Sequence, residues 1–286
     1  MPLSPSSEEV APERATHVRY VVVAVATLSP GVPLMPGVVL TPADRQALAT
    51  SLEDFARDEI GSGVSMTGAV LEGNAASEIT CYAREQHIPL IVLGTHGRSG
   101  FERLVTGSVA EKVLRTAPCP VLTVPPRVAD QVPLPAALFR RILCAIDFSP
   151  CSMQALAYAL SIAQEGGGVI TVVHVAELSP EDVAPLVGDD AADASPFREY
   201  LARAQSERAA QLEASVPPGV REYCTVDTVM ASGKPYHEIL RVAATRDSDL
   251  IVLGVHGRTP LDRFFFGSTA QHVVRAAACP VLTVRQ

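Results

Sequence analysis

Two glycine-rich segments carry the residue types and the spacing that suit phosphate binding. GTHGRSGFERLVTGS runs from Gly94 to Ser108, and GVHGRTPLDRFFFGS runs from Gly254 to Ser268. Each has three glycines in the pattern Gly-x2-Gly-x9-Gly, and a serine follows the last glycine. Glycines allow tight turns and a close approach of the backbone to an anion, and the serine adds a hydroxyl group. The alternative interpretation is a flexible loop that leads into a capped helix.

Each segment connects the end of an expected strand to the start of an expected helix. The strand IVLG ends at the first glycine, and the helix begins at the last, as GSVAEKVL or GSTAQHVV. The free amide groups and the dipole of a helix amino end favour an anion at this place. We expect Gly267 to let the backbone approach a phosphate, and Ser268 to cap the helix and donate its hydroxyl. We expect Gly254 and Gly257 to shape the turn.

The two segments belong to an internal repeat. The 34 residues from Ile91 and the 34 residues from Ile251 align without gaps at an offset of 160, and about 20 positions are identical. This period is far too long for a solenoid and indicates a duplicated domain. We therefore predict a first domain over residues 1–125, a proline-rich linker over 126–139 and a second domain over 140–286.

Strands rich in valine and isoleucine alternate with helices, and this order is clearest in the second half. Strands are expected over 140–147, 168–178, 221–230, 249–255 and 279–284, and helices over 153–164, 197–214, 235–246 and 267–278. This alternation predicts a parallel sheet covered on both faces, with five strands in each domain. Ligands of such doubly wound α/β sheets bind beyond the carboxyl ends of the strands, at the topological switch point.

Composition narrows the classes of function. The chain has 286 residues, a formal net charge of -8 and a pI of about 5.4, so the basic footprint of a nucleic acid-binding protein is missing. An acidic membrane surface is disfavoured for the same reason. No apolar run reaches the ~20 residues that span a bilayer, and the first 17 residues do not resemble a signal peptide, so we expect a cytoplasmic protein. The six cysteines lack the spacing of a metal site.

The glycine–serine spacing, its flanks IVLG and CPVLTV, and the order of elements together resemble the universal stress protein family. The chain is similar to a tandem member with two such domains. The resemblance implies a five-stranded parallel sheet in each domain. In members that bind ATP, it implies phosphate contacts from the glycine motif, an Asp at the end of the first strand, and adenine contacts at the end of the second strand. In this chain those residues are Asp147, Val175, Gly254, Gly257, Arg258, Gly267 and Ser268.

Two of these assignments have competing interpretations. Arg258 follows the second glycine, and it either faces the phosphates or is a solvated loop cation. Asp147 either contacts the nucleotide or simply caps the helix that follows it.

The first half departs from the family pattern at its start. SPSSEEVAPERA from Ser4 aligns with SPCSMQALAYAL from Ser149, so Pro2 stands where Asp147 stands in the second half. The first strand and its Asp are therefore missing, although weaker equivalents of the phosphate residues remain at Gly94, Gly97, Gly107 and Ser108. Three explanations stay open. Another segment fills the gap, the chain is an N-terminally shortened form, or residues 18–30 serve as the first strand.

Three functions compete on the sequence. The first is a nucleotide-sensing stress-response module that binds ATP with Mg, the second a slow ATPase, and the third a nucleotide-free dimerisation scaffold. The sequence has no complete Walker A motif, and it shows no obvious acid–base pair near the glycines, so we expect little or no turnover. As partners we expect ATP, pairing of the two domains through their CPVLTV edge strands, a homodimer, and proteins that the sequence does not identify.

Overall fold

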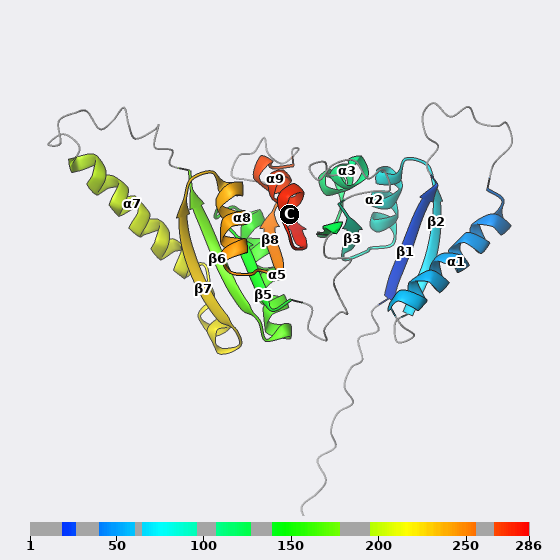
Figure 1. Cartoon of the computed structure of the whole chain (residues 1–286), viewed down its shortest axis with the longest axis horizontal. Coiled ribbons are helices and arrows are strands. Elements are labelled where there is room, and N and C mark those ends of the chain that lie inside the picture. The colour runs from blue at the N-terminus through cyan, green and yellow to red at the C-terminus, as the bar shows by residue number, and fades with distance from the viewer. Residues whose placement is uncertain are drawn as a thin grey trace, which may run out of the picture. The chain divides into compact units, whose positions relative to one another are not determined.

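The computed structural model describes residues 19–26, 40–60, 65–95, 107–126, 139–177, 195–255 and 266–285. The chain divides into two compact units, residues 1–79 and 80–286. The smaller unit contains β1 (Arg19–Ala26), α1 (Pro42–Ile60) and β2 (Ser65–Glu72), and the boundary falls inside α2 (Ala75–Glu85) (Figure 1).

The larger unit is built on a seven-stranded sheet with the order β3-β4-β9-β8-β5-β6-β7. All neighbouring strands are parallel except β4 and β9. The strands are β3 (Ile91–Gly94), β4 (Val121–Val124), β5 (Arg141–Ala145), β6 (Val169–Ala176), β7 (Thr225–Ser232), β8 (Leu250–Gly254) and β9 (Val281–Val284). The helices that follow α2 are α3 (Ser108–Thr116), α5 (Pro150–Gly166), α7 (Ser195–Ala214), α8 (Pro235–Thr245) and α9 (Ser268–Ala276). The doubly wound α/β fold expected for the second half is confirmed.

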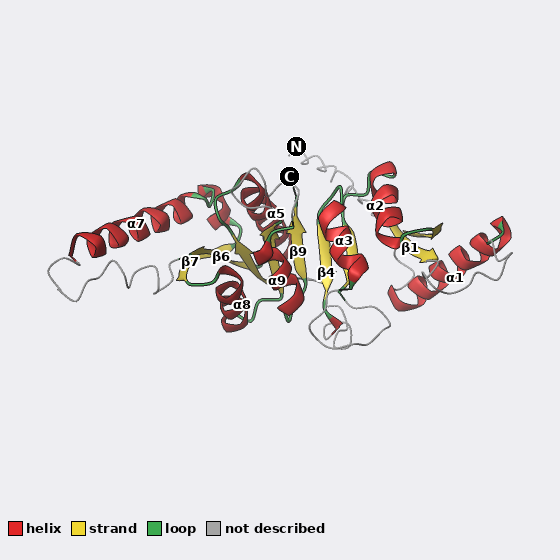
Figure 2. Cartoon of the chain, turned by 90° about the horizontal axis from the view of Figure 1, so that it is seen from above, coloured by secondary structure: helices red, strands yellow, loops and turns green. Residues whose placement is uncertain are grey.

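Helices cover both faces of the second-half sheet. Figure 2 shows α5 and α7 on one face and α8 and α9 on the other. On the first face, Ile142 and Cys144 of β5 pack in one cluster with Leu156 of α5, Leu212 of α7 and Val252 of β8. All five side chains are almost fully buried, as expected for a parallel sheet enclosed between two helical layers.

One strand of the second half begins four residues later than the sequence predicts. The strand expected over 221–230 starts at Thr225, because Pro218–Glu222 form a 3-10 helix. The Arg221 side chain holds this turn, since it donates to the Val226 carbonyl at 3.0 Å and to Glu213 at 2.6 Å.

The smaller unit shows which strand of the repeat β1 represents. β1 pairs with β2 in parallel from Arg19 opposite Ser65, and β6 pairs with β7 from Val169 opposite Thr225. The two ladders have the same register along the repeat, so β1 corresponds to β6, the second strand of the domain. The alternative that residues 18–30 serve as the first strand is therefore wrong. Within the described residues, β1 pairs only with β2 and β3 only with β4.

The two CPVLTV segments meet as antiparallel neighbours. Leu122 of β4 lies opposite Leu282 of β9, and this pair marks a local two-fold relation. The hydroxyl of Thr123 donates to the Val281 carbonyl at 3.1 Å, and that of Thr283 donates to the Val121 carbonyl at 3.1 Å. This pairing covers one apolar edge of each parallel segment.

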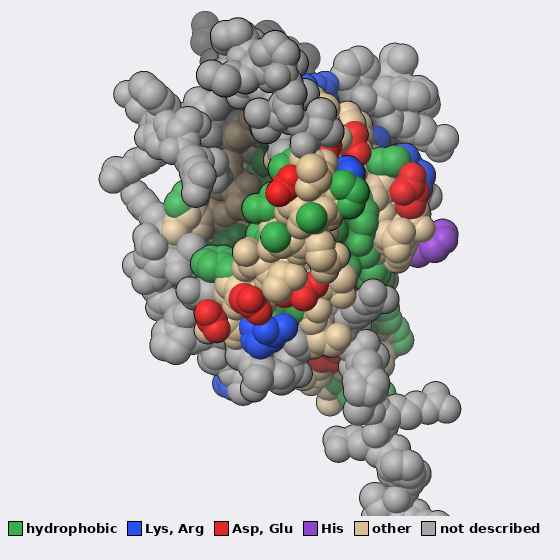
Figure 3. Space-filling model, turned by 90° about the vertical axis from the view of Figure 1, so that its right-hand side faces the viewer, with side chains coloured by type: hydrophobic (Ala, Val, Ile, Leu, Met, Phe, Trp, Pro, Cys, Tyr) green, Lys and Arg blue, Asp and Glu red, His purple; other side chains and the backbone are tan. Residues whose placement is uncertain are grey.

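Some apolar side chains remain exposed. Hydrophobic side chains appear at several places on the face drawn in Figure 3, among acidic and basic ones. On α1, Phe55 and Leu48 are 64% and 45% exposed. In the part of the chain that the structure describes, no helix is both long enough and apolar enough to cross a membrane.

Candidate functional site

The candidate site lies where the second-half chain diverges at the carboxyl ends of β5 and β8. These strands are parallel neighbours, with Ala145 opposite Leu253. After β5 the chain enters α5 on one face, and after β8 it returns through α9 on the other (Figure 2). This divergence is the topological switch point, where a cleft forms in folds of this class.

Asp147 lies in the turn between β5 and α5, and its carboxylate stabilises that turn. Its Oδ1 accepts from the Ser149 amide at 3.0 Å, and its own amide donates to the Ser152 Oγ at 3.2 Å. The helix is capped by Ser149, whose Oγ accepts from the Ser152 amide at 3.2 Å. The alternative that Asp147 caps α5 is therefore wrong.

A buried histidine supports the same turn. Phe148 has a φ of 64°, a left-handed conformation that bulky residues rarely adopt. Its ring centroid lies 4.5 Å from that of His174, a side chain of β6 that is only 3% exposed. His174 Nδ1 lies 2.8 Å from the Ile146 carbonyl oxygen, so this nitrogen carries the proton and donates. Nη1 of Arg208 in α7 lies 3.5 Å from the other ring nitrogen.

Sequence reasoning missed this support. The available signal was His174 itself, since it is the one ionisable residue in the strand VITVVHVA. Its partners Phe148 and Arg208 come from distant parts of the chain, and only the fold brings the three together.

Gly254 lies directly against the amino end of α5. A Cβ atom at this position would be 2.9 Å from the Ser152 amide nitrogen and 3.0 Å from the Cys151 carbonyl carbon. Contacts this short do not occur, so the absence of a side chain allows β8 and α5 to pack. Gly254 is thereby connected to Asp147, because Ser152 contacts both residues.

Gly267 closes the loop that follows β8. Its amide donates to the Val255 carbonyl at 2.9 Å, and a Cβ atom at Gly267 would lie 3.0 Å from that oxygen. Gly267 is also the N-cap residue of α9, and no side chain caps the helix. The prediction that Ser268 caps the helix is therefore wrong, because Ser268 is its first residue.

The first turn of α9 still presents several hydrogen-bond donors. The first bond within the helix runs from the Gln271 amide to the Gly267 carbonyl at 2.9 Å. The amides of Ser268, Thr269 and Ala270 therefore have no acceptor inside the helix. Two hydroxyl side chains accompany them, and Ser268 is exposed.

Val175 lies near the carboxyl end of β6, in the part of the strand that extends beyond the last residue of β5. Ala145, the last residue of β5, pairs with Val173, whereas β6 continues to Ala176. The Val173 carbonyl accepts from the Ile146 amide at 2.9 Å, so the backbone of Val173, and by alternation that of Val175, faces the β5 side. The backbone of Val175 is therefore directed to the space beyond β5. An adenine contact at this residue stays a prediction.

The structure thus brings five of the seven second-half residues to one edge of the sheet. These are Asp147, Val175, Gly254, Gly267 and Ser268. Gly257 and Arg258 lie outside the described residues, as does Gly97 of the first half.

The first half repeats only part of this arrangement. The Gly107 amide donates to the Thr95 carbonyl at 2.8 Å, as Gly267 does to Val255. Gly94 is exposed, however, and Ser108 is followed by Val109 where Ser268 is followed by Thr269. The first half therefore lacks one hydroxyl as well as the Asp.

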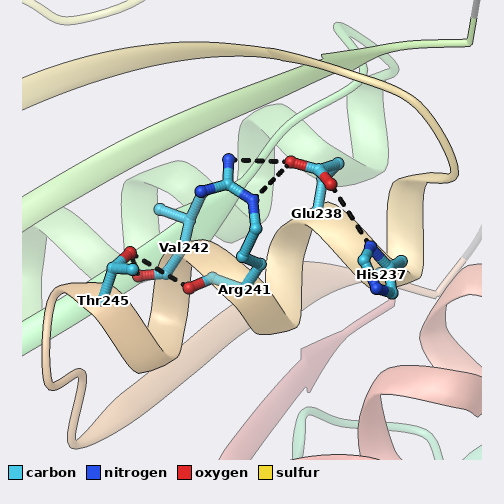
Figure 4. A network of polar contacts seen from close by, with 5 residues as sticks. All are labelled: His237, Glu238, Arg241, Val242 and Thr245. Atoms are coloured by element: carbon cyan, nitrogen blue, oxygen red, sulfur yellow. Dashed lines mark hydrogen bonds and ion pairs between the residues drawn. The ribbon is translucent and has the colours of Figure 1, made fainter.

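The carboxyl and thiol groups with shifted pKa values are not among the candidate site residues. On α8, the Arg241 hydrogen bond and then the His237 hydrogen bond lower the pKa of Glu238, which they contact at 2.8 and 3.3 Å (Figure 4). Burial raises the pKa of Cys144, and burial followed by the nearby charge of Asp249 raises that of Cys279 to about 11. Neither thiol is therefore a reactive nucleophile at neutral pH.

Other possible sites do not coincide with the switch point. Within the described part of the chain, no group of three or more His, Cys, Asp or Glu side chains is placed to hold a metal ion. A hollow of about 600 Å³, lined by Gly168, Arg221 and Tyr223 among others, lies at the amino ends of β6 and β7. Asp147 lies at the opposite end of these strands.

Comparison with known protein families identifies the family of this chain. A family model described as the universal stress protein family matches residues 8–125 and 138–285. The chain belongs to the universal stress protein family. Its two matched segments show a tandem member, as the repeat and its motif predict.

Several universal stress proteins are similar to this chain. One from Thermus aquaticus is 36% identical over 149 residues, which cover 52% of this chain and all of the relative. One from Methanocaldococcus jannaschii is 31% identical over 150 residues, or 52% of this chain and 84% of the relative. One from Mycobacterium tuberculosis is 30% identical over 197 residues, and the match covers 69% of this chain but only 62% of the relative.

Solved structures agree with this fold. A universal stress protein from Archaeoglobus fulgidus superposes with a TM-score of 0.60 at 22% identity, covering 94% of this chain and 86% of that one. A protein described as a putative universal stress protein from Pseudomonas aeruginosa gives a TM-score of 0.58 at 19% identity, covering 94% and 82%. At these identities the likeness supports the fold alone.

Proposed function

We propose that the second half binds ATP with Mg²⁺ at the switch point and acts as a nucleotide-sensing stress-response module. The observation that carries this proposal is a continuous series of short contacts across the site. Asp147 contacts Ser152, which packs against Gly254. The next residue, Val255, then bonds Gly267 at the start of α9. This series connects a carboxylate to a helix amino end at one sheet edge, which supports the proposal.

The first turn of α9 is the proposed phosphate site. Its three amides without helical acceptors and the hydroxyls of Ser268 and Thr269 suit phosphate oxygens, and the helix dipole adds to the attraction. Gly257 and Arg258 belong to the same loop and are proposed to contribute further phosphate contacts.

Asp147 is proposed to bind a different part of the ligand. A carboxylate repels phosphate oxygens, so it suits either the sugar hydroxyls or a Mg²⁺ ion that lies between the carboxylate and the phosphates. The Ser149 amide fixes the orientation of the carboxylate at 3.0 Å. The backbone of Val175 is proposed to bind adenine.

We propose little or no turnover. A carboxylate that stabilises its own turn, as Asp147 does, is a poor general base for a water molecule. Slow ATP hydrolysis is the highest activity that this proposal allows. The location in the cytoplasm stays a prediction.

A specific observation favours a second candidate, a nucleotide-free dimerisation scaffold. Gly254 and Gly267 each have a packing reason to be glycine, because a Cβ atom would come within 3.0 Å of backbone atoms. Two of the motif's glycines therefore need no phosphate to explain them. In that case Asp147 would only stabilise its turn.

Calorimetry with Mg-ATP separates these candidates. We expect one nucleotide per chain, and a binding loss of about tenfold or more in Asp147→Asn, since a hydrogen bond to a charged group contributes ~1.5–3 kcal/mol. The asparagine oxygen can still accept from Ser149, so the turn is retained.

The repeat supplies a matched pair of controls. Thr269→Val gives the second half the residue of the first, and Val109→Thr makes the reverse change. We expect the first to weaken binding by about fivefold, as loss of one hydrogen bond of ~1 kcal/mol does, and the second to change nothing. No binding by the parent chain would support the scaffold, and two equivalent sites would show that the halves do not differ as proposed.

A further inference from the structure

We propose that the free edge of β3 is a docking site for an extended apolar segment of another polypeptide, which adds to the sheet as a parallel strand. This inference concerns the first half and does not depend on nucleotide binding. It rests on the ladder of β3, on the exposure of its side chains, and on the strand that occupies the equivalent place in the second half.

Backbone groups of β3 point to this edge. The Ile91 amide donates to the Pro120 carbonyl at 3.0 Å, and the Thr95 amide donates to the Val124 carbonyl at 3.2 Å. Alternate residues of a strand direct their backbone groups to opposite sides, so those of Val92 and Gly94 face away from β4. Within the described residues, β3 has no other strand neighbour.

The same edge exposes an apolar surface. Val92 of β3 and Leu90, the residue just before the strand, are 59% and 41% exposed. Their equivalents in the repeat, Leu250 and Val252, are fully buried. An exposed strand edge beside exposed apolar side chains is the arrangement that recruits a further strand.

The outer edges of β7 and β2 carry protecting side chains. At β7, Arg221 donates to the outward Val226 carbonyl, and Glu213 bonds Thr228. At β2, Glu53 accepts from the Gly68 amide at 2.7 Å. No such contact to Val92 or Gly94 occurs among the described residues. The difference marks β3 as the unprotected edge of the seven-stranded sheet.

The second half shows what kind of segment fits. There β5 occupies the edge of β8, in parallel, from Ile142 opposite Leu250 to Ala145 opposite Leu253. The partner of β3 is therefore an extended segment with apolar residues at alternate positions, as in RILCA. One contact would be absent, because Asp249, which accepts from the Arg140 and Arg141 amides at 2.9 Å, is replaced by Pro89. Recognition then depends on the ladder and the apolar face.

Hydrogen exchange with a peptide tests the proposal. The peptide RRILSAIDF copies residues 140–148 with Cys144→Ser, and it is added to the full chain. We expect a dissociation constant between about 1 µM and 1 mM, and slower exchange at the amides of Val92 and Gly94 alone. The matched control peptide carries Leu143→Pro, which removes one amide and blocks a central position of the ladder, so it gives no protection.

A variant of the chain provides the second control. Val92→Lys places a charge on an exposed position, so the fold is retained while peptide affinity falls by about tenfold or more. Leu48→Lys, at an exposed position on α1, leaves the affinity unchanged. Protection at other strands, or none with saturating peptide, would overturn the proposal. So would slow exchange at Val92 in the chain alone that appears with rising protein concentration, since a second copy would then occupy the edge.

Discussion

Replacing Gly254 with alanine tests the packing at the switch point without any ligand. The added Cβ would lie 2.9 Å from the Ser152 amide nitrogen and 3.0 and 3.1 Å from two atoms of Cys151. The nearest two are backbone atoms of α5, so the helix must shift rather than a side chain rotate. Overpacking of this kind costs about 1–3 kcal/mol.

The repeat provides a control for this change 160 residues earlier. Gly94 is the equivalent glycine, and it is exposed. Neither glycine has a positive φ, so alanine causes no backbone strain at either position. Gly94→Ala should therefore change the stability by less than about 0.5 kcal/mol.

Thermal unfolding measures the difference. A cost of about 1–3 kcal/mol lowers the melting temperature of a unit the size of residues 80–286 by about 2–12 °C, and we expect this fall only in Gly254→Ala. Hydrogen exchange should locate the change at the start of α5. An equal fall in both variants, or none in Gly254→Ala, would refute the asymmetry between the two glycines.

Three further predictions concern groups away from this contact. Iodoacetamide at pH 8 should alkylate the exposed Cys81 long before Cys279, whose pKa of about 11 leaves about 0.1% thiolate, and mass spectrometry should show Cys279 labelling rise as the pH approaches 11. The Glu238 carboxyl should titrate below 4.5 by NMR, because Arg241 and His237 bind its charged form. The stabilisation that these contacts give the folded state is present above pH 4.5 and is lost as the pH falls through the lowered pKa. Arg241→Ala should move the midpoint of the Glu238 titration back up. Long incubation with Mg-ATP should release less product than the ~1 turnover per second typical of slower enzymes, and faster release would contradict the proposed role.

The sequence pattern predicts the strands and helices of the second half well, because each element is determined mainly by residues that are close together in the chain. Valine- and isoleucine-rich runs became strands, and Asp147 and Gly254 were placed at strand ends that the parallel order brings together. The alternative that Asp147 caps α5 is wrong, and the sequence could not decide it, since Asp147 and Ser149 are both good capping residues and only the turn geometry selects Ser149. The strand start at Thr225 was misplaced because a turn held by Arg221 depends on Glu213, a side chain from another element.

The sequence alone does not predict the long-range side-chain contacts. The tilted ring contact between Phe148 and His174, and the position of Arg208 next to the His174 ring, join three elements whose separation in the chain carries no periodic signal. The reason for a glycine at position 254 was also hidden. The motif predicted a turn around a phosphate, whereas the structure shows a close approach of two backbones.

The lack of a described strand between β1 and β3 explains why the compact units do not coincide with the sequence repeat. Without a strand to join β1 and β3, the first half has no continuous sheet among the described residues. β3, α3 and β4 instead extend the sheet of the second half through β9, where Val121, Thr123 and Thr283 are nearly fully buried. The compact boundary therefore falls within α2, after Ile79, far from the proline-rich linker. The antiparallel β4–β9 ladder covers the outer edge of β4. The edge of β3 that corresponds to the β5-paired edge of β8 has no strand neighbour among the described residues.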